Sequence, residues 1–190
     1  NSLKDLYPNI SFFSSLKEAG ALDYDAYTVV VPADHHFSVA KQLLEAGKHV
    51  LVEKPITLNS EDAQSLCDLA NKKGVTLMVG HLLLFHPAFI KMKELIQDGK
   101  LGKIQYIYSN RLNLGTVRTE ENSLWSFAPH DISIFQYFTD NSFPVKIKAS
   151  GSAFIQKGIY DSTLTTLEYE QGVHGHIFVS WLHPFKEHRL

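Results

Sequence analysis

Apolar residues follow two different rhythms along this chain. Early in the chain, three short apolar runs alternate with two segments of helical spacing. The runs lie at 26–32, 49–53 and 75–80, and the helical segments lie at 33–47 and 59–74. The first run is rich in β-branched residues and closed by Pro32, which is typical of a strand buried on both faces of a sheet. The alternation of strand and helix predicts parallel strands joined by right-handed crossovers.

The pattern changes between residues 80 and 86. Later segments predict two helices and four long alternating strands. The helices are expected at 87–102 and 128–138, and the strands at 103–114, 145–155, 161–170 and 173–182. Spacing in the second helix predicts that Ala128, Ile132, Phe135 and Phe138 point inward. Long alternating strands with short connections predict a mostly antiparallel sheet. The expected fold class is therefore α/β followed by α+β.

Composition excludes several classes of partner. The chain has 190 residues, 20% of them charged, and a formal net charge of −2, so neither nucleic acid nor an acidic membrane surface is an expected partner. No apolar run reaches the roughly 20 residues of a membrane span. One cysteine, Cys67, fits a reducing compartment and hence a cytoplasmic location. It shares a helical face with Leu66 and Ala70, which predicts a buried thiol.

Polar residues gather where the three early strands end. These endings are Pro32 to His36, Glu53-Lys54-Pro55 and Gly80-His81. A histidine after a strand is usually a loop residue, and a Glu-Lys pair is usually a solvated ion pair. Ligands nevertheless bind beyond the carboxyl ends of parallel strands, so three polar endings together predict a site. The Lys54–Pro55 bond is a candidate for the cis form.

Residues 25–58 carry a specific resemblance. The segment "DAYTVVVPADHHFSVAKQLLEAGKHVLVEKPITL" resembles the second half of the Rossmann domain in the glucose–fructose oxidoreductase/inositol dehydrogenase (Gfo/Idh/MocA) family. The matching features are Pro32 with His36, Ala46-Gly47-Lys48 and Glu53-Lys54-Pro55. The resemblance continues through the helix that carries His130 and so covers nearly the whole chain.

This resemblance implies an NAD(P)-dependent oxidoreductase acting on a sugar or polyol hydroxyl. It implies a partial Rossmann domain in residues 1–82 and a substrate-binding, oligomer-forming sheet domain in residues 83–190, with a dimer or tetramer expected. Lys54 and His130 are the implied catalytic residues: His130 would take the hydroxyl proton, and Lys54 would stabilise the developing alkoxide. The implied cofactor-binding residues are Pro32, Ala33, His36, Glu53, Lys54 and His81.

Two positions depart from the family pattern. Ser126 stands where many members have an aspartate, which puts a carboxylate relay to His130 in doubt, and Leu84 stands where many have an arginine. Residues 110–133 instead resemble the nucleotide-sugar branch, such as the UDP-N-acetylglucosamine or uronate 3-dehydrogenases. Candidate contacts to a nucleotide sugar are then Arg111, Asn113, Arg118, Asn122 and Trp125. Arginine pairs bidentately with phosphate or carboxylate, although solvated surface charge is the alternative for both arginines.

The glycine-rich loop that holds the dinucleotide phosphates is missing. None of the 11 glycines has another two residues away, so G-x-G-x-x-G does not occur. The motif is expected before residue 1, both ends look cut, and the isolated piece is expected to be inactive. We therefore attribute function to a longer parent protein.

Other function classes stay open on the sequence. A non-catalytic dinucleotide-binding regulator or binding subunit would share the fold, although the presence of both Lys54 and His130 favours an enzyme. A free-standing interaction domain would require a natural truncation. His174 and His176 lie on one strand face, but no third ligand accompanies them, so no metal site is predicted.

Overall fold

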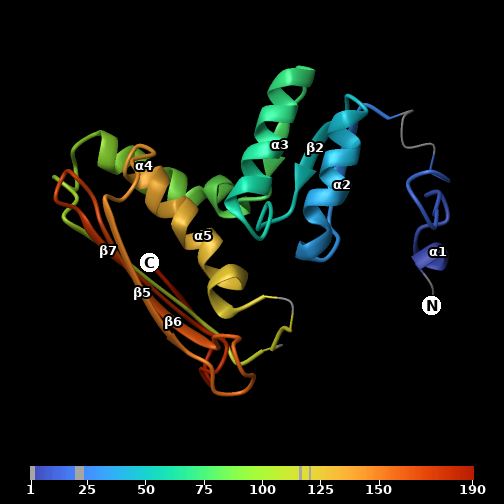
Figure 1. Ribbon diagram of the computed structural model, residues 1–190. Coiled ribbons are helices and arrows are strands. Elements are labelled where there is room, and N and C mark those ends of the chain that lie inside the picture. The colour runs from blue at the N-terminus through green and yellow to red at the C-terminus, as the bar shows by residue number, and fades with distance from the viewer. Residues whose placement is uncertain (1–2, 20–23, 116, 120) are drawn as a thin grey trace. The chain divides into compact units, whose positions relative to one another are not determined.

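The chain folds into two compact units, Asn1–Gly80 and His81–Leu190. The computed structural model in Figure 1 describes residues 3–19, 24–115, 117–119 and 121–190. The unit boundary lies beside the expected domain boundary between residues 82 and 83. Among the described residues, no helix is long and apolar enough to cross a membrane.

The first unit contains a three-stranded parallel sheet in the order β1-β2-β3. Its elements are α1 (Leu3–Leu6), β1 (Ala26–Val29), α2 (Ala33–Glu45), β2 (His49–Val52), α3 (Ser60–Lys73) and β3 (Leu77–Val79). Val29 is in register with Val52, and Val52 with Val79. The three carboxyl ends are therefore level, which confirms the parallel α/β prediction.

Helices α2 and α3 end at the glycines that the sequence predicts. In α3, the Asn59 side chain caps the helix by accepting a hydrogen bond from Asp62 N, and Gly74 ends it with φ 66°. Gly47 follows α2 with φ 75°. The Lys54–Pro55 peptide bond is cis, as the sequence suggested.

Helices α2 and α3 cover only one face of this sheet. Leu44 and Leu66 pack there against Val29 and Val52. The prediction that the first strand is buried on both faces is therefore wrong for the described structure, because no described helix covers the other face. Thr28 of β1 and Met78 of β3, for example, are exposed, Met78 by 42%.

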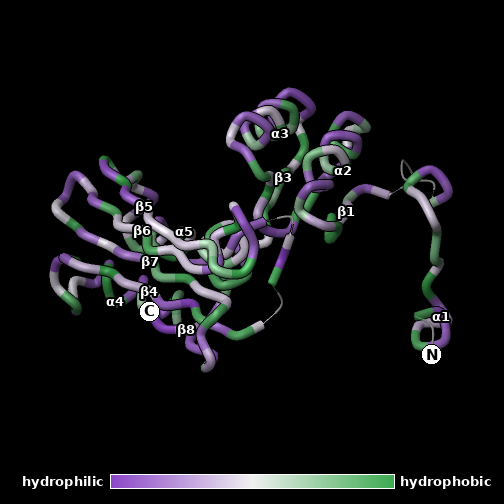
Figure 2. The backbone as a smooth tube through the Cα atoms, turned by 60° about the horizontal axis from the view of Figure 1, so that its bottom comes forward, coloured by the Kyte–Doolittle hydropathy of each residue, from purple (hydrophilic) through white to green (hydrophobic). Residues whose placement is uncertain are grey.

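The prediction of a buried Cys67 is also wrong, because its side chain is exposed. The buried stripe of α3 is centred on Leu66 and Ala70. Successive helical residues are about 100° apart, so Cys67 points away from Leu66. Figure 2 shows that much of α3 is hydrophilic, as expected of a helix with one buried stripe.

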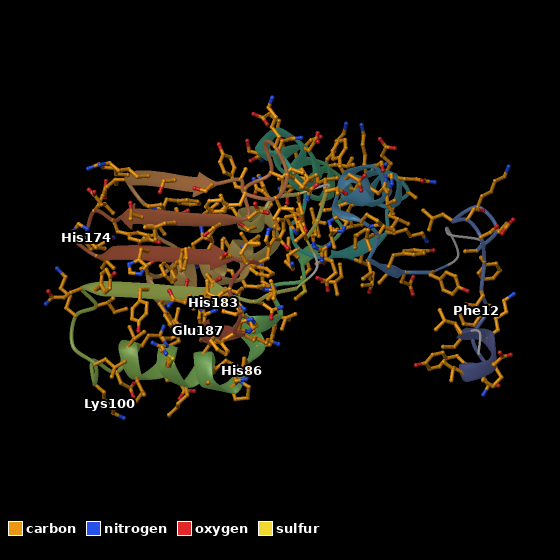
Figure 3. The ribbon with its side chains drawn as sticks, turned by 90° about the horizontal axis from the view of Figure 1, so that it is seen from below. Phe12, His86, Lys100, His174, His183 and Glu187 are labelled. Atoms are coloured by element: carbon orange, nitrogen blue, oxygen red, sulfur yellow. The ribbon has the colours of Figure 1, made fainter. Side chains whose placement is uncertain are left out.

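The second unit is a five-stranded sheet in the order β5-β6-β7-β4-β8, packed against helices. Its elements are η1 (Leu82–Phe85), α4 (Pro87–Gln97), β4 (Tyr106–Leu112), α5 (Ser123–Phe138), β5 (Lys146–Ser152), β6 (Ser162–Glu168), β7 (His174–Ser180) and β8 (Glu187–Arg189). All pairs are antiparallel except β4 with β7, which confirms a mostly antiparallel sheet. Figure 3 shows the strands side by side, with His174 at one end of the sheet.

Helix α5 packs on one face of this sheet. Phe135 is fully buried against the β7 residues Ile177 and Val179. Gly175 permits this approach, because a Cβ there would lie 2.9 Å from the Phe135 ring. The helix begins at Ser123, before the predicted Ala128, because Asn122 caps it.

One predicted core position of α5 is wrong. Ile132 is 42% exposed, whereas its neighbour Asp131 is buried. The inward face runs through Ala128, Asp131 and Phe135, because Asp131 has a buried cationic partner described below. Ile132, about 100° further round the helix, faces outward.

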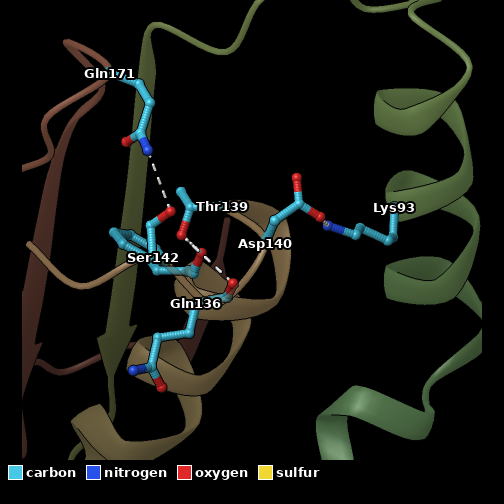
Figure 4. A network of polar contacts seen from close by, with 7 residues as sticks. Lys93, Gln136, Thr139, Asp140, Ser142 and Gln171 are labelled. Carbon is cyan, nitrogen blue, oxygen red and sulfur yellow. Dashed lines mark hydrogen bonds and ion pairs between the residues drawn. The ribbon is translucent and has the colours of Figure 1, made fainter.

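Polar contacts fix the end of α5 to α4. Figure 4 shows Lys93, which is buried on α4, paired with Asp140 at 2.5 Å beyond the end of α5. The Lys93 ammonium also lies 5.4 Å from the Tyr137 ring centroid. Thr139 Oγ1 closes the helix by donating to Phe135 O. The carboxyl-terminal end of α5 is thus held in place.

Candidate active site

The polar endings of the first unit meet at one edge of its sheet. Glu53 continues β2, and its N–H donates to Val29 O at 3.0 Å. Gly80 continues β3, and its N–H donates to Val52 O at 2.8 Å. Backbone pairing therefore carries the alignment one residue past the strands and places Glu53 and Gly80 side by side.

The Glu53 carboxylate lies directly against Gly80. A Cβ built on Gly80 would come within 3.2 Å of the carboxylate carbon and both carboxylate oxygens. The carboxylate is half-buried, and its Oε2 accepts from Lys54 N at 3.3 Å. Glycine at the end of β3 thus leaves room for an acidic side chain across the strand ends.

Lys54 is half-buried between this carboxylate and the buried Pro55. It follows the buried Val52 by two residues, at the point where the main chain leaves the sheet. Its ammonium can donate three hydrogen bonds.

His36 is the most buried of the predicted site residues, with 2% of its surface exposed. Its Nδ1 lies 2.6 Å from Pro55 O, and its Nε2 lies 2.9 Å from Val31 O. Both ring nitrogens thus contact backbone carbonyls of this chain. Pro32 caps α2 and Ala33 is its first residue, so both lie at the same edge of the sheet. A role in cofactor binding stays a prediction for these three residues.

The second unit carries His130 on α5, half-buried. Its carbonyl accepts a hydrogen bond from Ser133 Oγ at 2.7 Å. Ser126, where many family members have an aspartate, lies one helical turn earlier and is buried. His81 is half-buried and precedes η1.

Beside His130, Asp131 accepts two hydrogen bonds from Arg111. Arg111 Nε donates to Oδ2 at 2.8 Å and Nη2 donates to Oδ1 at 2.9 Å, and both residues are buried. The alternative of a solvated surface charge is therefore wrong for Arg111. Asp131 is not among the residues predicted from the sequence, although an acidic residue next to the candidate base and an arginine on a predicted strand were visible signals.

His188 of β8 lies in register with Arg111. Burial, and after it the charges of Arg111 and Lys186, lower the pKa of His188. A lowered pKa favours the neutral ring beside Arg111. The short strand β8 was also missed, because its run of three polar residues has no apolar pattern.

The remaining predicted substrate residues lie before and within the first turn of α5. Arg118 is exposed and pairs with the buried Glu121 at 3.2 Å. Asn122 caps α5 by accepting from Trp125 N at 3.1 Å, and the Trp125 ring is partly exposed. Asn113 is half-buried and its N–H donates to Ser180 O. The structure thus gathers Arg118, Asn122 and Trp125, whereas Arg111 is committed to Asp131.

The strand ends of the first unit carry groups that can hydrogen-bond the ribose of a dinucleotide. A half-buried carboxylate beside a glycine can accept hydrogen bonds from ribose hydroxyls, and Lys54 stands next to it. No G-x-G-x-x-G motif occurs in the chain, so its own residues do not supply the usual phosphate loop. Within the described ranges, no group of three or more histidine, cysteine or acidic side chains could hold a metal ion.

Comparison with family models covers most of the chain. Residues 5–81 match an oxidoreductase family model with an NAD-binding Rossmann fold, and residues 89–190 match the GFO/IDH/MocA C-terminal domain. The chain belongs to the GFO/IDH/MocA oxidoreductase family. Both the resemblance and the fold class predicted from the sequence are confirmed.

Individual members of the GFO/IDH/MocA family are similar to the chain. UDP-N-acetylglucosamine 3-dehydrogenase of Acidithiobacillus ferrooxidans is 30% identical over 134 residues, which cover 70% of this chain and 41% of that protein. Inositol 2-dehydrogenase of Rhizobium meliloti is 25% identical over 162 residues, covering 80% and 49%. The chain thus spans about half the length of these relatives.

Solved structures of the family agree with the fold. The Acidithiobacillus enzyme superposes with a TM-score of 0.82 at 26% identity, covering 93% of this chain and 56% of that one. GenD2 from gentamicin A biosynthesis, solved in complex with NAD, gives a TM-score of 0.88 at 24% identity, covering 96% and 56%. At that identity the second likeness shows the fold alone.

Proposed function

We propose that this chain is part of an NAD(P)-dependent oxidoreductase that moves a hydride between a secondary sugar hydroxyl and nicotinamide. The observation that carries the proposal is the position of Lys54, half-buried beside Glu53 where three parallel strands end level. Membership of an NAD-binding family of oxidoreductases supports it.

Lys54 and His130 would divide the handling of the hydroxyl group. The Lys54 ammonium would donate a hydrogen bond to the reacting oxygen and stabilise its developing negative charge. His130 would take the hydroxyl proton, because histidine changes charge near neutral pH. Glu53 would accept hydrogen bonds from ribose hydroxyls, and nicotinamide, when bound, supplies the acceptor for the hydride.

A nucleotide sugar is the favoured substrate class. Arg118 supports this choice. Its Nε pairs with Glu121, but its guanidinium is 47% exposed beside the first turn of α5 and can exchange that pairing for a phosphate. Trp125 would pack on a sugar face, and Asn113 would donate to its hydroxyls. The 30% sequence identity with UDP-N-acetylglucosamine 3-dehydrogenase also favours a nucleotide-sugar substrate. We infer that Arg111 holds α5 in place and does not contact the substrate, because its guanidinium is already paired with Asp131.

The uncovered face of the five-stranded sheet favours a homo-oligomer. The exposed residues Tyr106, Tyr108 and Leu164 alternate with residues that face α5. Exposed apolar faces are often covered by a partner, and a second copy is the simplest one. Light scattering of the full-length protein, with Leu164→Glu as the disrupting variant, would give the expected dimer or tetramer.

Absorbance of reduced nicotinamide tests the proposal. The full-length protein is mixed with NAD or NADP and a panel of UDP-sugars, dTDP-sugars and free polyols. A rise in absorbance with one compound, lost on Lys54→Met, is the expected result. Binding of the dinucleotide with no turnover of any compound would instead favour the alternative, a non-catalytic binding subunit of the same fold.

A further inference from the structure

His36 joins two segments of the first unit that leave neighbouring strands. Val31 follows β1, and Pro55 follows β2, and the buried ring of His36 stands between their carbonyl oxygens at 2.9 and 2.6 Å. A histidine placed for ligand contact would present a nitrogen to a cavity. Here both nitrogens face the main chain.

The contact to Pro55 lies next to Lys54. On the amino-terminal side of Lys54, the N–H of Glu53 donates to Val29 O at 3.0 Å. On its carboxyl-terminal side, the Pro55 carbonyl is held by His36 Nδ1 at 2.6 Å. The backbone of Lys54 is therefore fixed on both sides, first by the sheet and then by this one side chain.

We propose that His36 is a positioning residue, and that its Nδ1–H bond to the Pro55 carbonyl sets the direction in which Lys54 points. This inference rests on the function proposed above, in which Lys54 acts on the reacting oxygen. A displacement of about 1 Å in a catalytic group can reduce turnover on the order of 100-fold, so a single backbone bond beside Lys54 matters.

Substitution of His36 by Asn or by Gln distinguishes the two contacts of the ring. The Asn amide nitrogen is two bonds from Cβ, like Nδ1, and the Gln amide nitrogen is three bonds from Cβ, like Nε2. His36→Asn therefore keeps a donor toward Pro55 O, and His36→Gln keeps one toward Val31 O. A neutral imidazole donates from one nitrogen only, so the variants also show which contact is the necessary one.

The experiment compares His36→Asn, His36→Gln and His36→Ala in the full-length protein. His49→Asn is the matched control, because His49 also contacts a backbone group, Thr76 N at 2.9 Å, but stands at the opposite end of β2. We expect His36→Asn to keep kcat within about threefold, and the other two His36 variants to lose kcat roughly 10- to 100-fold with a smaller change in the KM for NAD. His49→Asn should leave both constants unchanged.

Equal loss of kcat in His36→Asn and His36→Gln, or no loss in His36→Ala, would overturn the proposal. Hydrogen exchange of the peptide covering residues 49–58 provides a readout that needs no substrate. The proposal expects faster exchange in His36→Gln than in His36→Asn. If the wild type has no dehydrogenase activity but this difference is found, the proposed function fails, whereas the role of His36 in holding the Pro55 carbonyl is supported. If no difference in exchange is found, that role of His36 is overturned.

Discussion

Arg111 and Asp131 form a bidentate ion pair between β4 and α5, with N–O distances of 2.8 and 2.9 Å. Asp131 immediately follows His130, so the pair fixes the turn of α5 that carries the candidate base. A planar guanidinium holds a carboxylate in one orientation, which a lysine in its place would not do.

Breaking one side of this pair should be strongly destabilising. Asp131→Asn leaves the Arg111 charge buried without its counter-charge, and we expect the free energy of unfolding to fall by about 3–5 kcal/mol. Replacing both, as Arg111→Met with Asp131→Leu, should cost clearly less than the single change, because no buried charge remains. Urea denaturation of the wild type and these two variants checks this. A double variant as unstable as Asp131→Asn would contradict the account.

Lys54→Met removes the charge and the donors but keeps a similar length of side chain. We expect a loss of kcat of at least roughly 100-fold if Lys54 acts on the reacting oxygen. Steady-state kinetics of the full-length protein measures it, with the far-ultraviolet spectrum as a check on folding. A loss below roughly tenfold would remove Lys54 from the mechanism.

Gly80→Ala should act through Glu53. The new Cβ would crowd the carboxylate at 3.2 Å, and displacement of that carboxylate should weaken dinucleotide binding roughly tenfold. Titration of NAD into the full-length protein measures the effect. In a Glu53→Ala background the same glycine change should add little, because the crowded group is gone. An equal loss in both backgrounds would show that Gly80 acts by another route.

Asp161 makes a pH-dependent contribution to the stability of the second unit. Its fully buried carboxylate accepts hydrogen bonds from Trp181 Nε1 at 2.8 Å and from the N–H groups of Phe154 and Ile155. Burial alone raises the pKa of Asp161, but these hydrogen bonds outweigh it, and the pKa lies below its ordinary value of 3.8. A depressed pKa stabilises the fold above pH 3.8, and this stability is lost as the pH falls through the folded-state pKa.

Asp161→Asn should therefore lower the free energy of unfolding by about 1–3 kcal/mol at pH 7. The gap to the wild type should shrink as the pH falls below 3.8. Denaturation curves at several pH values measure it. Glu168→Gln, a change to an exposed ion pair with Lys146, is the control and should have the smaller effect. A gap that does not depend on pH would show that the Asp161 charge contributes nothing.

Local signals in the sequence were enough to predict most of the fold. Asn59 and Gly74 bound α3 as their types predict, since caps act within one turn of the helix. Exposure was harder to predict. Cys67 and Ile132 each lie at the edge of the buried stripe of their helix. Whether such a position is buried depends on the element that packs against the helix, and that element is far away in the sequence.

The candidate site divides in the same way. Glu53 and Lys54 were predictable, because a strand end is a local feature. The clamp by His36 and the pairing of Arg111 with Asp131 join residues 19 and 20 positions apart. Such contacts depend on how elements pack, so the same residues suggested cofactor and substrate contacts when read from sequence alone.

Transfer of a labelled hydride tests the central claim most directly. The full-length protein is incubated with NAD and UDP-N-acetylglucosamine deuterated at ring carbon 3, and the nicotinamide product is weighed by mass spectrometry. The account predicts reduced nicotinamide carrying one deuterium, formed at least roughly 100-fold more slowly by the Lys54→Met variant. If the protein binds both NAD and the sugar but no deuterium appears in the nicotinamide, the result would contradict the account.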